Sequence, residues 1–394
     1  MADARIDPAV PGWPLGSPDV VDPSHGGESG AARRGPWVPG VATGVGSMPG
    51  TDPVDAAATV AGELPDLPHL VELPARGAGA DMIGRTAALL VDLPAEVVPS
   101  GWRLTRRPGR DLQRARDFLA WDLDAAEQRF TGAPWVKAQL AGPWTLAAML
   151  ETPSGNRAVL DPGAVADLAA SLTEGLLDHL AQLRRRLPGT GIVVQVDEPS
   201  LPAVLAGSLP TASGFGSVPA VDQADVRQRL ADLVDALDGY PVTAHCCHPA
   251  APVRLLRDAG FAALGLDVTA LGTSAGRLDP IGEAVEAGAV LLAGLVPTRD
   301  PGPDGAPDPG SRPGPDAEPG QGDGTPGAAA GAYTYRRAAE PLLDLWDRLG
   351  LQRSRLVQVV PTPTCGLAGA TPDWARRALH LCRDVARLLA DESA

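Results

Sequence analysis

The chain reads IVVQV at residues 192–196, VTAHCC at 242–247 and FAALGLD at 261–267. Each of these apolar runs is short and ends in polar residues, and a longer segment of mixed polarity separates it from the next. Short runs rich in branched apolar residues between turn residues are typical of buried β-strands. The stretch therefore predicts consecutive parallel strands that are joined by helices.

The same alternation of apolar runs and mixed segments extends toward both ends of the chain. Helical spacing is clearest at 164–187, where Leu168, Leu172, Leu176 and Leu180 form one stripe. Eight strand–helix repeats are the number that closes a (β/α)8 barrel, so the sequence predicts an α/β TIM barrel. The five further runs are VATGVG at 41–46, HLVEL at 69–73, WVKAQLA at 135–141, VLLAGLV at 290–296 and LVQVV at 356–360.

A doubly wound open sheet is the competing arrangement of strands and helices. In that fold a glycine-rich loop after the first strand binds the phosphates of a dinucleotide. Residues 44–50, GVGSMPG, lack the glycine spacing of such a loop and lead into a helix start at Thr51-Asp52-Pro53. The barrel is therefore the favoured interpretation.

Two segments are too rich in Pro, Gly and small polar residues to form part of a packed core. These are residues 1–40 and the insertion 300–331, and we expect both to be disordered. Because the strand–helix rhythm continues across the insertion, residues 41–392 are predicted to form a single catalytic domain. The insertion follows the seventh apolar run, so we expect it to border the opening of the barrel.

Composition narrows the classes of partner. The chain has 394 residues, a formal net charge of −15 and a pI near 4.8, which argues against nucleic acid and anionic membranes as partners. No apolar run reaches the roughly 18 to 20 residues of a membrane span. The N-terminus has no basic-then-apolar secretion pattern, so we expect a cytoplasmic protein. Four cysteines are too few for a disulfide scaffold in a chain of this length.

Three of the residues at the ends of the predicted strands are of the type that binds zinc. His245 and Cys247 lie on one face of a strand end because side chains alternate, and Cys246 then faces a helix. Cys365 lies in TPTCGL after the last apolar run, where it can reach across the barrel axis. Three protein ligands and an open position are typical of catalytic zinc. Asp267 is either a fourth ligand or a helix cap.

Other polar side chains gather at the same predicted end of the barrel. Asp197 and Glu198 close one apolar run, where they can bind a substrate ammonium or orient a proton donor, or instead cap a helix. Ser47, after Gly46, can offer its hydroxyl and nearby backbone N–H groups to a substrate carboxylate. Lys137 is either a buried cation near the carboxylates or a structural residue at the far end of the barrel.

Several segments together resemble the catalytic barrel of cobalamin-independent methionine synthase. The His-x-Cys element and the distal Cys-Gly are the specific features, and the resemblance spans about 41 to 390 without the two disordered segments. The matching segments are GVGSMPGTDP, GADMIGRT, VKAQLAGPWTL, VQVDEPSL, AHCCHP and TPTCGL.

The resemblance implies a zinc-dependent methyltransferase that methylates the thiol of homocysteine to give methionine. Zinc would be held by His245, Cys247 and Cys365, with Asp267 where the family carries a glutamate. By the same resemblance, Ser47 would bind the carboxylate of the amino acid and Asp197 its amine. A thiol that coordinates zinc loses its proton and is a strong nucleophile.

The chain departs from the family in three respects. It has one barrel where long members have two, Gly84 stands where the family has a glutamate that contacts the amine, and LVPTRD at 295–300 lacks the Asp-x-His that assists proton transfer. The methyl donor is therefore either methyl-folate or a corrinoid protein, whose cobalt-bound methyl needs no proton on the leaving group.

Two alternatives to a methionine synthase remain at this point. One is another zinc-dependent thiol alkyltransferase, such as an epoxide–thiol transferase, and the other is a catalytically degenerate barrel that binds a metal or a thiol. A uroporphyrinogen decarboxylase-like barrel has no need of the His-x-Cys and distal Cys set, which argues against it.

Overall fold

The structure is a computed structural model, and it describes residues 35–211, 214–302 and 333–393. The predicted disorder of most of the insertion 300–331 and of most of the segment 1–40 lies outside the described residues. At 35–40 the prediction is wrong, because Trp37 is buried and packs with Val41 and Leu67.

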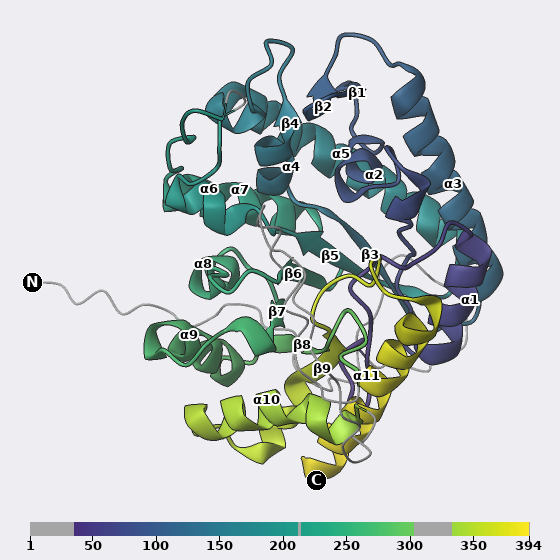
Figure 1. The fold of residues 1–394 in the computed structure, drawn as a ribbon, viewed down its shortest axis with the longest axis vertical. Coiled ribbons are helices and arrows are strands. Elements are labelled where there is room, and N and C mark those ends of the chain that lie inside the picture. Colours follow the sequence, from purple (N-terminus) through teal and green to yellow (C-terminus); the bar gives the residue numbers. More distant parts are fainter. Residues whose placement is uncertain (1–34, 212–213, 303–332, 394) are drawn as a thin grey trace, which may run out of the picture.

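Six parallel strands form one curled sheet in the order β3-β5-β6-β7-β8-β9 (Figure 1). Every neighbouring pair in this order is parallel, which confirms the predicted alternation of strands and helices. The strands are β3 Trp135–Ala141, β5 Gly191–Asp197, β6 Val242–Cys246, β7 Ala263–Asp267, β8 Val290–Val296 and β9 Val359–Pro363.

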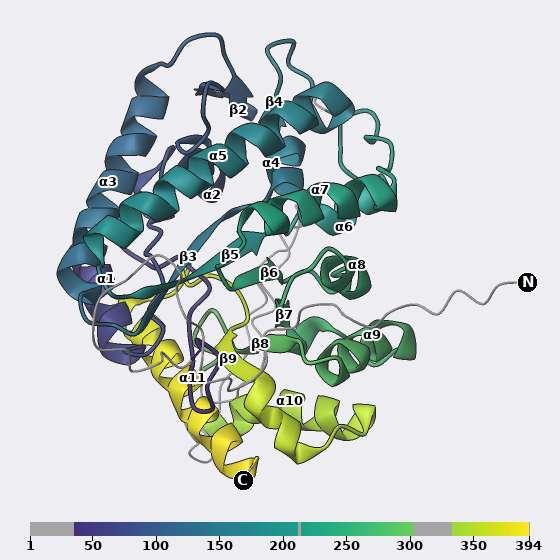
Figure 2. The same cartoon turned by 180° about the vertical axis from the view of Figure 1, so that it is seen from behind.

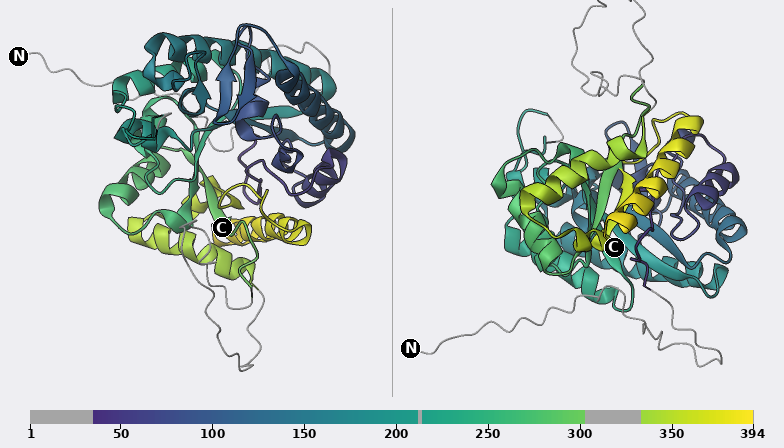
Figure 3. Two further views of the ribbon diagram at one scale, coloured as in Figure 1. Left: turned by 45° about the horizontal axis from the view of Figure 1, so that its top comes forward. Right: turned by 90° about the horizontal axis from the view of Figure 1, so that it is seen from below.

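Helices cover the outer face of this sheet, as the views from the front, the back and the ends show (Figures 1, 2 and 3). The leucine stripe of α5 is fully buried against the sheet, as its spacing predicted. The helices are α1 Pro53–Glu63, α2 Met82–Ala87, α3 Arg110–Phe130, α4 Pro143–Met149, α5 Pro162–Arg186, α6 Leu201–Ala206, α7 Gln223–Ala236, α8 Val253–Asp258, α9 Ala275–Glu286, α10 Tyr335–Leu349 and α11 Pro372–Glu392.

The first two predicted strands are not regular strands. Segments 41–46 and 69–73 make single parallel bridges, Ser47 to Glu72 and His69 to Lys137. Hydrogen bonds from Thr43 N to the Pro361 carbonyl (3.2 Å) and from Leu70 N to the Lys137 carbonyl (2.8 Å) join these segments to β9 and β3. The described residues thus form a curled six-stranded half-barrel, a TIM-barrel-like fold, and the full eight-stranded barrel stays a prediction.

Close approach explains why these two segments are irregular. A Cβ at Gly44 would lie 2.4 Å from Nε2 of the buried His69 ring, so glycine leaves room for the imidazole beside this segment. Glycine inside a strand weakens the regular ladder while it allows such approach. The apolar pattern therefore located both segments correctly and overstated their regularity.

A second, small sheet was not predicted. It contains β1 Ala95–Val98, β2 Gly101–Leu104 and β4 Leu150–Glu151 in the order β1-β2-β4. Trp102 of β2 is buried against α2, where a Cβ at Gly84 would lie 2.6 Å from the indole carbon Cζ2. The hairpin thus closes the space at Gly84 from outside the barrel.

The interior of the half-barrel is layered along the strand direction. At the amino ends of the strands, inward side chains form an apolar cluster: Trp37, Val41, Leu67, Val193, Ala263, Val290, Leu292 and Val360. On β5 the inward positions continue as Val193, Gln195 and Asp197, because every second residue faces the interior. The interior therefore changes from apolar to polar toward the carboxyl ends of the strands.

Among the described residues no helix is long and apolar enough to cross a membrane.

Candidate functional site

A cavity lies at the carboxyl ends of the strands, with a volume of about 310 Å³. Active sites of such barrels form at this end of the sheet. Its lining residues are Val45, Gly46, Ser47, Glu72, Pro74, Ala80, Asp81, Met82, Asp197, Pro199, His245, Cys247, Cys365 and Gly366. A larger cavity of about 560 Å³ beside α4, α5 and α7 has neither His nor Cys in its lining. The smaller cavity is therefore the candidate site.

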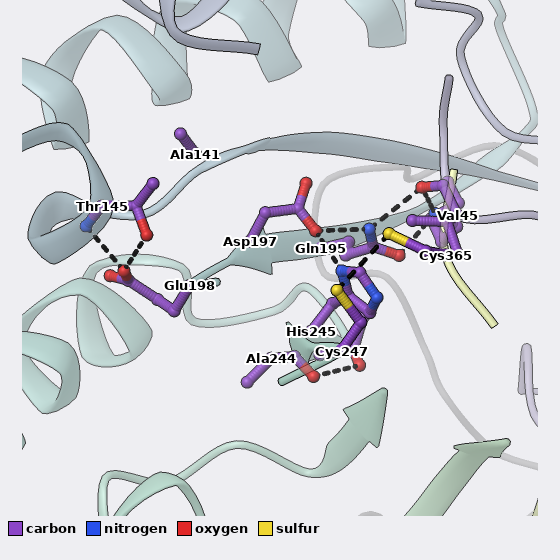
Figure 4. A network of polar contacts seen from close by, with 12 residues as sticks. Val45, Ala141, Thr145, Gln195, Asp197, Glu198, Ala244, His245, Cys247 and Cys365 are labelled. Atoms are coloured by element: carbon purple, nitrogen blue, oxygen red, sulfur yellow. Dashed lines mark hydrogen bonds and ion pairs between the residues drawn. The ribbon is translucent and has the colours of Figure 1, made fainter. Parts of the chain in front are cut away.

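Two thiols meet in this cavity. Cys247 follows β6 and Cys365 follows β9, and their Sγ atoms are 3.4 Å apart (Figure 4). Cys246 is buried on the opposite side, as the alternation of side chains predicted. Two thiolates on one tetrahedral zinc are about 3.8 Å apart, given Zn–S bonds of about 2.3 Å. The spacing of the two sulfurs is thus close to that of a shared metal.

His245 lies beside the thiols and is held by Asp197. The two residues are direct neighbours in the register of β5 and β6. Nδ1 of His245 is 2.8 Å from Oδ1 of Asp197, and Gln195 donates to the same oxygen at 2.7 Å (Figure 4). Histidines that bind metals commonly use one ring nitrogen for a carboxylate in this way and the other for the metal.

The side chains in the cavity are of types that bind zinc, but their positions fit a bound zinc less well. Two thiols and a carboxylate-bound imidazole are ligands that zinc prefers. Yet in the ranges that the structure describes, no group of three or more His, Cys, Asp or Glu side chains is placed to hold a metal ion. Cys247 and Cys365 form a close pair with His245 as a neighbour, and a metal would require His245 to adjust.

Asp267 takes the second of its two predicted roles. It is absent from the cavity lining, and its Oδ1 accepts hydrogen bonds from Thr269 N (3.0 Å) and Thr269 Oγ1 (2.6 Å). It therefore caps the short 3-10 turn Val268–Ala270 at the end of β7.

The two thiols share their protons unequally. The hydrogen bond between the two thiols, together with the charge of His245 and the N–H of Gly366, lowers the pKa of Cys365 to about 6 against the effect of burial. The same hydrogen bond and burial raise the pKa of Cys247. Burial opposes a charged His245, but the hydrogen bond and charge of Asp197 raise its pKa overall. Of the two thiols, Cys365 is therefore the one that more readily becomes a thiolate.

Glu198 does not reach the cavity, which contradicts its predicted catalytic role. Its carboxylate accepts hydrogen bonds from Trp144 N (3.0 Å), Thr145 N (2.7 Å) and Thr145 Oγ1 (2.7 Å) at the start of α4. Burial raises its pKa to about 7. Figure 4 shows Glu198 and Asp197 pointing in opposite directions, because consecutive residues at a strand end face opposite sides.

Lys137 is the buried cation near the carboxylates, and its alternative placement at the far end is wrong. It is fully buried, and its Nζ donates to the Val45 carbonyl (2.8 Å) and to Oε1 of Gln195 (2.6 Å). Burial lowers its pKa to about 8, while the charges of Asp197 and Glu72 oppose that shift.

Ser47 and Gly46 line the same cavity as the thiols. The Ser47 carbonyl accepts a hydrogen bond from Leu367 N (2.8 Å), which places Ser47 beside the loop that carries Cys365. Glu72 also lines the cavity and was not singled out from the sequence. Burial raises its pKa, and its position as the last polar residue of the run HLVEL was the available signal.

Comparison with known proteins extends the description. The family profile "Cobalamin-independent synthase, Catalytic domain" matches residues 41–302. A B12-independent methionine synthase from Shewanella sp. W3-18-1, solved with selenomethionine, aligns at a TM-score of 0.53 and 11% identity, over 90% of this chain and 98% of that chain. A methyltransferase from Methanosarcina mazei aligns at a TM-score of 0.50 and 13% identity, over 88% and 94%. Comparison with curated proteins gives no match.

The two structural similarities are too distant in sequence to show more than a common fold. The profile match is the stronger result, because residues 41–302 make up well over half of the 394 residues and include β3 to β8 with His245 and Cys247. The chain therefore belongs to the cobalamin-independent methionine synthase family, and it is a methyltransferase.

Proposed function

We propose that the protein transfers a methyl group to the thiol of homocysteine and gives methionine, with zinc as its cofactor. The observation that carries this proposal is the thiol pair of Cys247 and Cys365, 3.4 Å apart and beside His245 in one cavity. Thiol pairs next to an imidazole suit zinc, and few other roles need them at the mouth of a barrel.

His245, Cys247 and Cys365 would hold the metal. Zinc, when bound, supplies a positive charge that lets a coordinated substrate thiol lose its proton near neutral pH. Asp197 holds the imidazole of His245 in place, and the negative charge at Cys365 favours a cation between the side chains. The cavity of about 310 Å³ is at the small end of ligand pockets, which suits a compact amino-acid thiol.

The remaining groups of the cavity suit the two charged ends of such a substrate. Ser47 can donate its hydroxyl to the carboxylate. Gln195 and His245 both bond to Oδ1 of Asp197, and its other carboxylate oxygen points away from them and can accept the ammonium (Figure 4). Aligning the thiol with the methyl donor is the main contribution that the protein then makes to the rate.

For the methyl donor we propose methyl-folate or a methyl-corrinoid. When methyl-folate gives up its methyl group, the nitrogen that is left behind needs a proton. When cobalt gives up a methyl group, no proton is needed. The residues that follow β8 are Pro297, Thr298 and Arg299, and among the residues that the structure describes His245 is the one histidine in the cavity lining. This lack of a second histidine in the lining favours the corrinoid, which a corrinoid protein would present.

We also infer that segments 41–46 and 69–73 complete an eight-membered ring. Their hydrogen bonds to β9 and β3 bridge the two edges of the six-stranded sheet, which supports this closure.

The proposal is tested with purified full-length protein in two measurements. Elemental analysis should find about one zinc per chain. Incubation with homocysteine and either methyl-tetrahydrofolate or methylcobalamin should yield methionine, detected by mass spectrometry. A folded, metal-free protein that makes methionine would remove zinc from the proposal. A zinc-loaded protein that methylates homocysteine with neither donor, but opens an epoxide with a small thiol, would favour the alkyltransferase alternative.

A further inference from the structure

Lys137 is the only lysine among the 394 residues, and it lies inside the half-barrel beneath the cavity. Burial of an ammonium group is unfavourable unless hydrogen bonds and opposite charges compensate for the lost water. Lys137 has both, through the Val45 carbonyl (2.8 Å), Oε1 of Gln195 (2.6 Å) and the nearby charges of Asp197 and Glu72. A lysine held in this way has a defined orientation.

Lys137 fixes the direction of the hydrogen bonds that run from it. An ammonium group only donates, so the oxygen of the Gln195 amide must face it. The amide nitrogen of Gln195 then faces Oδ1 of Asp197 (2.7 Å) and the Val45 carbonyl (3.0 Å). A reversed amide would place N–H groups against the ammonium and an oxygen against the Asp197 carboxylate.

The same direction continues to His245. Oδ1 of Asp197 accepts from Gln195 and lies 2.8 Å from Nδ1 of His245. A carboxylate only accepts, so Nδ1 must carry the proton of this bond. Nε2 is then the ring nitrogen left with a lone pair for a ligand. The sequence of groups Lys137, Gln195, Asp197 and His245 forms a hydrogen-bond relay with one direction (Figure 4 shows its last three members).

Lys137 also contacts the segment that carries Gly46 and Ser47. The Val45 carbonyl accepts from both Lys137 and Gln195, and Val45 precedes Gly46 and Ser47, which line the cavity. One buried cation thus links the wall that would bind the substrate carboxylate with the wall that carries His245.

We propose that Lys137 is a positioning residue of the site: acting through Gln195, it holds the Asp197 carboxylate against Nδ1 of His245, which keeps the Nδ1–H form in place and leaves Nε2 for the metal. The role of Lys137 in metal binding rests on the proposed function, whereas its effect on the His245 ring does not.

The first test reads the His245 ring in the folded, metal-free protein. A proton shared between Nδ1 and a carboxylate gives a downfield proton resonance that is coupled to ¹⁵N in histidine-labelled protein. We expect this resonance in the wild type, assigned by its absence in His245→Ala, and its loss in Lys137→Met and in Gln195→Met. Thr243→Val is the matched control, because Thr243 is a fully buried side chain on the same strand as His245 and outside the relay.

The second test measures zinc affinity by competition with a chelator. Loss of an outer partner of a metal-binding histidine weakens binding about 10- to 100-fold, and we expect about tenfold for Lys137→Met. Gln195→Met should have a similar effect. The double variant should bind zinc about as tightly as the single variant with the lower affinity, because both changes break one relay. If the fold-loss of zinc affinity in the double variant equals the product of the two single losses, the two residues act separately.

Different results would overturn the relay from Lys137 and the proposed zinc-dependent function. An unchanged His245 resonance in Lys137→Met and Gln195→Met would overturn the relay, whatever the metal content. If Lys137→Met does not fold, Gln195→Met decides by the same resonance, since it keeps the lysine. A wild type that shows the resonance and binds no zinc would overturn the proposed function and leave the relay intact.

Discussion

Two sulfur atoms 3.4 Å apart set the chemistry of the cavity at the scale of single residues. At this distance, the hydrogen bond between Cys247 and Cys365 lowers the pKa of Cys365. Cys246 is next in sequence, but burial raises its pKa to about 12, so it stays a thiol. Adjacent cysteines therefore have different chemistry because they face different surroundings.

Replacement of Cys365 by serine should remove the metal without unfolding the protein. Serine keeps the size of the side chain but is a poor zinc ligand, so we expect zinc affinity to fall by more than the roughly 100-fold that loss of an outer partner costs. Elemental analysis and chelator competition measure this change. Cys246→Ala is the control and should keep its zinc, because Cys246 is buried away from the cavity. Equal zinc content in Cys365→Ser and the wild type would exclude Cys365 as a ligand.

Zinc binding should release protons and weaken as the pH falls. The pKa of Cys247 is raised above its usual value, so this thiol holds a proton near neutrality that the metal must displace. Below about pH 6, the Cys365 thiolate takes up a proton as well. Calorimetric titration in buffers of different ionisation enthalpy counts the protons. Affinity that does not change between pH 6 and 8 would contradict this assignment of charges.

At the scale of elements, α4 depends on a carboxylate from outside the helix. Its first residues lack a side-chain cap of their own, and Glu198 supplies the acceptor for the N–H groups of Trp144 and Thr145. Since Glu198 directly follows β5, this contact ties α4 to the strand that carries Asp197. The residues that directly follow β5 therefore position both the start of α4 and one wall of the cavity.

Replacement of Glu198 by alanine should therefore lower stability and leave the metal in place. Buried N–H groups without a partner cost about 1–3 kcal/mol each, so we expect the free energy of unfolding to fall by at least that amount. Urea titration measures stability, and elemental analysis measures zinc. An alanine variant of normal stability that makes no methionine would instead support the catalytic role that the sequence suggested.

The sequence predicted the repeated strand–helix units and missed the hairpin β1-β2, which lies outside them. Six apolar runs overlap strands of the structure, and the leucines of α5 lie on its buried face. Burial of one or both faces of an element produces a periodic pattern of apolar residues, which the sequence displays. The hairpin β1-β2 left no such trace. It is held by Trp102 and by contacts with α2, which are distant in sequence.

The candidate site was predictable in part for a similar reason. His245, Cys247, Cys365, Ser47 and Asp197 are residue types with few uses at strand ends, and all five line one cavity. Glu198 was misassigned because residue type alone does not tell which face of a strand a side chain takes. The relay from Lys137 was beyond prediction, since it depends on the register of strands that are far apart in sequence.

At the scale of the whole molecule, buried histidines should make the fold sensitive to acid. Burial and the charge of Arg85 lower the pKa of His179 to about 4 in the folded protein, below its ordinary value of 6.5. The unfolded chain therefore binds more protons between these values. The stabilising contribution is complete above pH 6.5 and is lost as the pH falls toward 4.

His179→Leu should reduce this loss. At pH 5 the linkage for one such histidine amounts to about 2 kcal/mol, so the free energy of unfolding should fall by about that much less in the variant than in the wild type. Urea titrations of both proteins at pH 7.5 and pH 5 give the comparison. An equal decrease in the two proteins would show that His179 is not responsible.

Trp37 and the apolar residues around it fill the floor of the half-barrel. In the proposed reaction, the substrate, the product and the methyl donor would therefore all pass through the opening at the carboxyl ends of the strands. A product that leaves slowly would then block the next donor, and its release would limit turnover.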